Sequence, residues 1–233
     1  MASSRNTGKR ARRLASEAPV EQHYQATVKE IKPLNWVQET YLNAIKHNTI
    51  VFGIGSAGTG KTYIAASYAA NELLARRISK IILTRPNVET GRELGHLPGD
   101  LDEKYAPYLR PFQHILTKSL GGQGQFEYFL KSKVIEPAPL GFMRGETFEN
   151  AIVLVDEAQN MTKTEFMMIL SRVGRNCRVI LSGDPKQFDI KDSGLLDAVK
   201  RLEGIEDIEV VHFQDSDIVR SKMCKAVIMA YRD

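Results

Sequence analysis

The chain has 233 residues, of which 42% are hydrophobic, and its formal net charge is +4. This length and composition predict one domain with a buried core and exclude two large domains. Because no apolar run approaches the roughly 20 residues that cross a bilayer, we expect a cytoplasmic protein with no membrane partner.

The positive charge is concentrated at the N-terminus. Residues 1–19 carry one acidic residue, Glu17, and five basic ones, Arg5, Lys9, Arg10, Arg12 and Arg13, so this segment accounts for the whole net charge. Since it has almost nothing to bury, we expect a disordered tail over 1–19 and a folded domain over 20–233. The tail could bind phosphates of a nucleic acid through counterion release, or it could simply keep the protein in solution.

Asn35 and Gln38 precede the first predicted strand and allow two interpretations. Their spacing is that of a capping box, in which the pair satisfies backbone groups at the start of a helix. The Gln38 amide could instead bind the N6 and N7 edge of adenine, as glutamine does with adenine elsewhere. Both interpretations stay open at this stage.

Short β-branched runs alternate with helical patterns and predict the buried parallel strands of an α/β fold. The predicted strands are Thr49–Ile54, Lys80–Leu83, Ala151–Val155, Arg178–Leu181 and Glu209–Phe213. Right-handed crossovers bring the carboxyl ends of such strands to one edge of the sheet, where ligands bind. We therefore expect the functional residues at that edge.

The first strand runs into a complete G-x-x-x-x-G-K-[ST] motif, and a helix is predicted behind it over Tyr63–Leu74. In a P-loop of this kind the backbone N–H groups and the helix N-terminus surround the phosphates. Lys61 is expected to neutralise the outer phosphates, and Thr62 to offer its hydroxyl to Mg²⁺. The residues predicted to hold ATP are Gly55, Ser56, Ala57, Gly58, Thr59, Gly60, Lys61 and Thr62.

The third strand ends in two acids, Asp156 and Glu157. A carboxylate beside a P-loop can hold Mg²⁺ through a water, which is the role predicted for Asp156. Glu157 could orient and deprotonate the attacking water, although either acid could instead cap a helix end. A capping box formed by Thr162 and Glu165 predicts a helix directly after this strand.

The fourth predicted strand ends in the segment Leu181-Ser-Gly-Asp-Pro-Lys-Gln187, which contains Asp184 and Gln187. We expect both side chains across the phosphates from Glu157, where the Gln187 amide could sense the γ-phosphate. A simple turn that ends the strand is the alternative, because Asp-Pro is a common turn opener.

Together, the P-loop and the paired acids predict a single RecA-like core with helices on both faces of a parallel sheet. Four arginines lie at or near predicted loops or helix starts, where a guanidinium could bind phosphate with two hydrogen bonds. They are Arg85, Arg110, Arg144 and Arg220. The first three are candidates for nucleic-acid binding.

With these motifs the chain resembles the PhoH-like family of ATPases, whose core is similar to one half of superfamily-one helicases. The resemblance covers nearly everything after the tail. A stand-alone core of this size is similar to the forms carried by bacteriophages. Besides the P-loop, the motifs that carry it are Arg85-Pro-Asn-Val-Glu-Thr-Gly91, Leu97-Pro-Gly-Asp-Leu101, Tyr108-Leu-Arg-Pro111, Met143-Arg-Gly145, Asp156-Glu-Ala-Gln-Asn160, Gly183-Asp-Pro-Lys-Gln187, Ser193-Gly-Leu195 and Asp217-Ile-Val-Arg220.

The resemblance implies ATP binding and hydrolysis, a role in RNA or single-stranded nucleic-acid metabolism, and association into rings. Because one P-loop supplies one face of an ATP site, we expect a homo-oligomer, a hexameric ring, in which a neighbour's arginine completes each site. Arg220 is the first candidate for that arginine. The alternatives are a nucleotide-gated binding protein without motor activity and a P-loop kinase; Glu157 and the lack of an obvious arginine-rich lid oppose the kinase.

Overall fold

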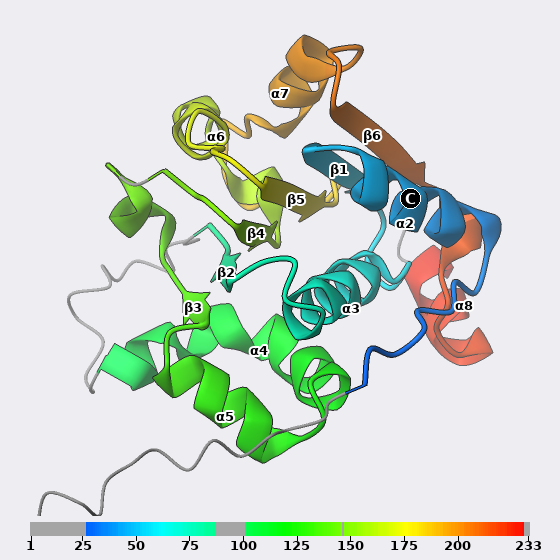
Figure 1. Cartoon of the computed structure of the whole chain (residues 1–233). Coiled ribbons are helices and arrows are strands. Elements are labelled where there is room, and N and C mark those ends of the chain that lie inside the picture. The colour runs from blue at the N-terminus through cyan, green and yellow to red at the C-terminus, as the bar shows by residue number, and fades with distance from the viewer. Residues whose placement is uncertain (1–26, 87–100, 146, 231–233) are drawn as a thin grey trace, which may run out of the picture.

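Among the described residues, six parallel strands form one sheet in the order β3-β2-β4-β5-β1-β6 (Figure 1). The computed structural model describes residues 27–86, 101–145 and 147–230. The predicted tail (1–19) and most of the motifs Arg85-Pro-Asn-Val-Glu-Thr-Gly91 and Leu97-Pro-Gly-Asp-Leu101 therefore lie outside the described residues. The strands are β1 (Ile50–Gly55), β2 (Lys80–Thr84), β3 (Ile135–Pro137), β4 (Ala151–Val155), β5 (Cys177–Gly183) and β6 (Ile208–Phe213).

The five predicted strands are confirmed, each within two residues of its predicted ends. The short edge strand β3 was not predicted. It pairs in parallel with β2, Ile81 lying opposite Ile135. Three residues carry too little periodicity to distinguish a strand from a loop, and the pairing that defines β3 comes from a strand far away in the sequence.

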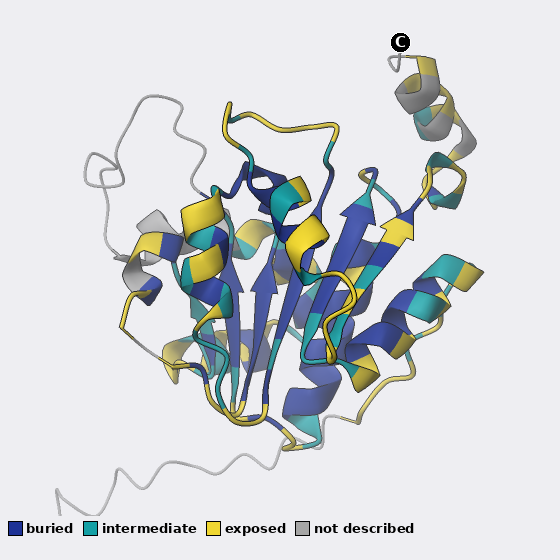
Figure 2. Cartoon of the chain, turned by 90° about the horizontal axis from the view of Figure 1, so that it is seen from above, coloured by how far each residue is buried: buried dark blue, intermediate teal, exposed yellow. Residues whose placement is uncertain are grey.

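Helices cover both faces of the sheet, as predicted for a RecA-like core (Figures 1 and 2). Alternate residues of each strand point to opposite faces. In β4, Ile152 and Leu154 pack in the core below α2, α3, α4 and α5, whereas Val153 and Val155 pack in the core below α6 and α7. The helices are α2 (Trp36–His47), α3 (Lys61–Leu74), α4 (Leu101–Ser119), α5 (Gln123–Lys131), α6 (Lys163–Leu170), α7 (Leu195–Leu202) and α8 (Lys222–Ala230), with short 3-10 helices η2 (Leu140–Met143), η3 (Ala158–Asn160) and η4 (Asp215–Asp217).

The predicted capping box begins α6. The Thr162 hydroxyl accepts a hydrogen bond from the Glu165 backbone N–H at 3.3 Å, and the Glu165 carboxylate accepts one from the Thr162 N–H at 2.8 Å. Gly194 then allows α7 to start against this turn, because its N–H donates to Met161 O at 2.7 Å and a Cβ would lie 2.5 Å from Lys163 N. The local sequence thus sets how α6 and α7 pack.

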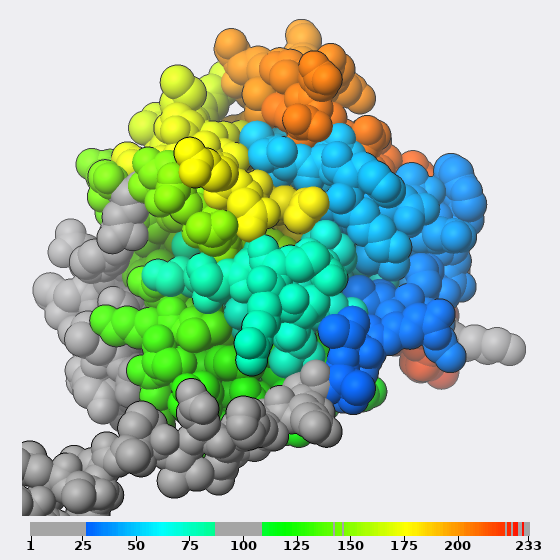
Figure 3. Space-filling model, viewed as in Figure 1, coloured from blue at the N-terminus to red at the C-terminus, as the bar shows by residue number. Residues whose placement is uncertain are grey.

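The two edges of the sheet differ. At the amino edge, side chains join segments far apart in the sequence: Asn176 donates to Arg77 O at 2.9 Å, and residues near 75–80 and 170–178 lie side by side in the space-filling view (Figure 3). At the carboxyl edge, β5 lies between β1 and β4, with Ile54 opposite Gly183 and Val155 opposite Leu181. The motifs that follow these three strands therefore meet at one edge.

None of the described helices combines the length and the apolar character that a bilayer span requires.

Candidate nucleotide-binding site

The loop between β1 and α3 has the backbone that the P-loop motif requires. Gly55, Gly58 and Gly60 all have positive φ, at 139°, 82° and 89°. A Cβ on Gly55 would overlap the carbonyl oxygen of Phe213, and one on Gly60 would lie 2.6 Å from the Gln38 side-chain nitrogen. Because α3 begins at Lys61, the first free N–H groups of the helix follow directly on this loop.

Lys61 is buried beneath the loop. Its Nζ donates to Gly55 O at 2.6 Å and to Ser56 O at 2.7 Å, and it lies 5.7 Å from the centroid of the Phe213 ring. Burial lowers the pKa of Lys61 to about 8, although the nearby charges of Asp184, Asp156 and Glu157 act in the opposite direction. An ammonium with little water around it interacts strongly with an anion that enters the loop.

Thr62 and Asp156 meet across the edge of the sheet. The Thr62 hydroxyl donates to Asp156 Oδ1 at 3.2 Å. Burial, together with the neighbouring Glu157 carboxylate, raises the pKa of Asp156 to about 6. Two adjacent, half-buried carboxylates favour a cation. These donors fit Mg²⁺, which takes one or two protein oxygens and completes its shell with phosphate and water. In the described part of the chain, no group of three or more His, Cys, Asp or Glu residues is placed to hold a metal ion.

Glu157 has a left-handed backbone, with φ 54° and ψ 39°. Such a conformation is uncommon for residues other than glycine and often occurs at functional sites. The side chain is held by Gln159, whose Nε2 donates to Glu157 Oε2 at 2.5 Å. Gln159 on η3 therefore fixes the position of the Glu157 carboxylate.

Gln159 also binds the loop that follows β5. Its Nε2 donates to Gln187 O at 3.0 Å, and its Oε1 accepts from the Asp184 N–H at 3.0 Å. The side chain is 1% exposed and lies outside the residues that line the pocket. The sequence predicts no role for Gln159, whose one signal is its place in Asp156-Glu-Ala-Gln-Asn160.

Replacing Gln159 with leucine should lower kcat for nucleotide hydrolysis by about 10- to 100-fold, because a displacement of about 1 Å can cost that much. KM should stay nearly unchanged, since Gln159 does not line the pocket. Steady-state kinetics would separate the two constants, with Gln123→Leu, at an exposed position of α5, as control. A rise in KM with unchanged kcat would contradict this positioning role.

Asp184 and Gln187 both line the pocket, and the turn expected as the alternative is present. Gln187 N donates to Asp184 O at 3.0 Å, which closes a turn after β5. Asp184 is 6% exposed; its Oδ1 accepts from the Lys186 N–H at 3.1 Å, whereas its Oδ2 has no hydrogen-bond partner among the described residues. The turn thus directs one buried carboxylate oxygen and one exposed amide toward the P-loop.

These residues surround one cavity of about 290 Å³ at the carboxyl edge. It brings together most of the predicted site. The lining residues are Ala57, Gly58, Gly60, Lys61, Thr62, Tyr63, Asp156, Glu157, Ser182, Gly183, Asp184, Gln187 and Arg220. Gly55, Ser56 and Thr59 do not line it but shape the loop: the Ser56 hydroxyl donates to Asp215 Oδ1 at 2.5 Å, and the Thr59 hydroxyl to Ser56 O at 2.9 Å.

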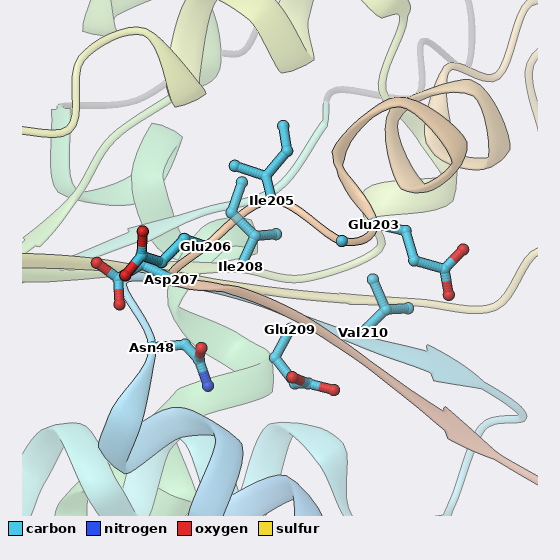
Figure 4. Close-up of a pocket in the computed structure, with 9 residues that line it drawn as sticks. Asn48, Glu203, Ile205, Glu206, Asp207, Ile208, Glu209 and Val210 are labelled. Atoms are coloured by element: carbon cyan, nitrogen blue, oxygen red, sulfur yellow. The ribbon is translucent and has the colours of Figure 1, made fainter.

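A larger hollow of about 480 Å³ lies at the amino end of β6 (Figure 4). Four carboxylates line it, those of Glu203, Glu206, Asp207 and Glu209, and no basic residue is among the lining residues. Because these charges repel phosphate, the smaller cavity at the P-loop is the better candidate for a nucleotide.

For Gln38 the structure favours the structural role over adenine recognition. The side chain is 2% exposed; its Oε1 accepts from Leu34 N at 2.8 Å and its Nε2 donates to Thr59 O at 2.9 Å. Asn35 caps α2 by accepting from the Gln38 N–H at 2.9 Å. Gln38 thus joins the start of α2 to the P-loop, and it offers almost no surface to a base.

Arg220 lies in the pocket of its own chain. The Val219 N–H donates to Gly58 O at 3.0 Å, and a Cβ on Gly58 would lie 2.6 Å from Arg220 Nε. These contacts favour a role for Arg220 at the P-loop of its own chain over the predicted role at a neighbouring subunit's site.

The other three arginines do not line the pocket. Arg85 follows β2, and its charge lowers the pKa of Asp156, so it lies near the metal-binding candidates. Arg110 on α4 and Arg144 after η2 are exposed. The structure does not bring Arg110 or Arg144 together with the P-loop residues, and their role in nucleic-acid binding stays a prediction.

Comparison with known proteins agrees with the motifs. Over 202 residues the chain is 43% identical to Protein PhoH of Escherichia coli K12, covering 84% of this chain and 57% of that protein. It is 44% identical over 206 residues to the PhoH-like protein of Bacillus subtilis 168, covering 87% and 64%. The chain thus spans less than two thirds of these cellular bacterial relatives, and the likeness to bacteriophage forms stays an expectation.

Among solved structures, a Pif1 helicase from Candida albicans matches 78% of this chain and 40% of its own, at 14% identity and a TM-score of 0.40. A likeness this distant supports no inference about function. The model of one family, described as PhoH-like protein, matches residues 30–232. The chain therefore belongs to the PhoH-like protein family.

Proposed function

We propose that this chain binds ATP together with Mg²⁺ and hydrolyses it. The observation that carries the proposal is the 3.2 Å contact between Thr62 Oγ1 and Asp156 Oδ1, beside Lys61 and Glu157 in one pocket. These are the four groups that phosphoryl transfer to water needs: a phosphate-binding cation, two metal-holding oxygens and a carboxylate that can accept a proton.

Each group has a separate role in the proposed reaction. The loop N–H groups and Lys61 bind the β- and γ-phosphates, while Thr62 and Asp156 would hold Mg²⁺. Bound Mg²⁺ would neutralise charge on the phosphate oxygens. Glu157 would accept the proton of the attacking water, and the exposed side chain of Gln187, which lines the same cavity, would contact the γ-phosphate. Arg220 adds positive charge from within the same chain.

Product analysis tests hydrolysis directly. We expect the chain to release inorganic phosphate from Mg·ATP, and a phosphate assay with ³¹P NMR of the products would measure this. A phosphorylated acceptor without free phosphate would identify a kinase instead. Tight binding without release would identify a nucleotide-gated binding protein.

We further propose that hydrolysis is coupled to RNA or single-stranded DNA in a homo-oligomeric ring, a hexamer. Exposed Arg110 and Arg144 and membership of the PhoH-like family support this coupling. One P-loop supplies one face of the ATP site, so the opposite face would come from a neighbour. Because Arg220 lines the pocket of its own chain, that neighbour would contribute another group.

The ATPase rate with RNA, single-stranded DNA and duplex DNA, at several salt concentrations, tests this coupling. Stimulation by a single strand supports it, and an unchanged rate with all three polymers contradicts it. Light scattering with and without nucleotide would report the ring.

A further inference from the structure

The lining of the P-loop cavity contains two kinds of group. Most of the polar groups are suited to phosphate and metal, from Lys61 to the carboxylates that follow β4 and β5. Phosphates bound there leave the base of a nucleotide to lie farther out. Among the described residues that line the cavity, Tyr63 is the one aromatic side chain, and it is 45% exposed.

Three segments are joined around the P-loop. Gln38 ties the start of α2 to the loop through Thr59 O, and Asn35 Nδ2 donates to Asp217 O at 3.4 Å. The bond from Val219 N to Gly58 O then places Arg220 at the same cavity as Tyr63. The cavity lining therefore includes one aromatic ring and one guanidinium, both planar groups on exposed residues.

We infer that Tyr63 stacks on the nucleobase, with Arg220 beside it, and that the site accepts ATP and GTP with similar affinity. The inference rests on the proposed function. Every base has a π-face that an aromatic ring or a guanidinium can cover, so stacking discriminates poorly between purines. The residue best placed by sequence to read adenine, Gln38, is 2% exposed, with both polar atoms bonded to backbone.

Binding of ATP, GTP and inorganic tripolyphosphate, each with Mg²⁺, tests the inference by calorimetry. Tyr63→Ala should weaken ATP and GTP binding by about tenfold each, the usual effect of removing one base–aromatic stack. Tripolyphosphate has no base, so its affinity should not change. Tyr63→Phe keeps the ring and should bind like the parent, as should the control Tyr128→Ala, which alters an exposed tyrosine on α5.

The outcomes distinguish a failure of the proposed function from a failure of stacking by Tyr63. If the parent binds neither ATP nor tripolyphosphate, the proposed function itself fails. If it binds both and Tyr63→Ala leaves ATP affinity unchanged, or weakens tripolyphosphate as much as ATP, stacking by Tyr63 is overturned. A parent that prefers ATP over GTP by more than roughly tenfold would overturn the shared affinity, since stacking alone tolerates every base.

Discussion

Replacing Lys61 with alanine should lower kcat/KM for Mg·ATP by about 10²-fold or more, as loss of a single preorganised charge or donor at a reacting phosphate or oxyanion does. The Lys61 ammonium lies inside the loop, against Gly55 O and Ser56 O, where its charge is poorly screened by water. Nucleotide affinity should fall as well, because the lysine meets the phosphates in the ground state. Phosphate release and calorimetry would measure the two effects.

Lys200→Ala on α7 is the matched control, because it removes the same charge from an exposed position outside the pocket. The thermal unfolding curve of Lys61→Ala should stay close to that of the parent if the fold is intact. A variant that folds and still turns over ATP within about threefold of the parent would remove the basis of the proposed function.

Replacing Glu157 with glutamine should reduce kcat by about 10²- to 10⁴-fold, the usual contribution of a general base. The change keeps the shape of the side chain, and Gln159 can still donate to the oxygen of the new amide. Affinity for Mg·ATP should stay near the parent's or rise, because one negative charge leaves the vicinity of the phosphates. Single-turnover hydrolysis and equilibrium binding would test both halves.

Glu203→Gln is a suitable control for Glu157, since Glu203 is exposed and lies at the acidic hollow away from the P-loop. Loss of binding in Glu157→Gln would indicate that the carboxylate helps to hold the metal. Unchanged turnover would assign the proton acceptor to another group.

The strands, the P-loop and the acids after β4 could be predicted because their signals are local. A β-branched run that ends in Asp156 and Glu157 identifies both the strand and its exit from the sheet, and parallel topology then brings such exits together. The same holds for α6, whose capping box lies within four residues. In these cases the sequence contains both the element and the reason for its position.

The remaining features depend on contacts between distant segments. Gln38 belongs to α2 but is buried by the P-loop, and Arg220 follows β6 but contacts Gly58. Gln159 binds residues on either side of the pocket. No periodicity or spacing encodes these pairs, because each depends on where two separate strands end in space.

The position of β5 between β1 and β4 bears on how a carboxylate and a phosphate could share this edge. Neighbouring strands are about 4.8 Å apart, so the strand ends that carry Gly55 and Val155 are separated by about 10 Å. Between them, β5 ends in the small residues Ser182 and Gly183, which line the cavity and fill little of it. If β1 and β4 were neighbours in the sheet, the Glu157 carboxylate would lie close to the phosphate and repel it. With one strand between them, the Glu157 carboxylate and the phosphate leave space for a water molecule to bind between them.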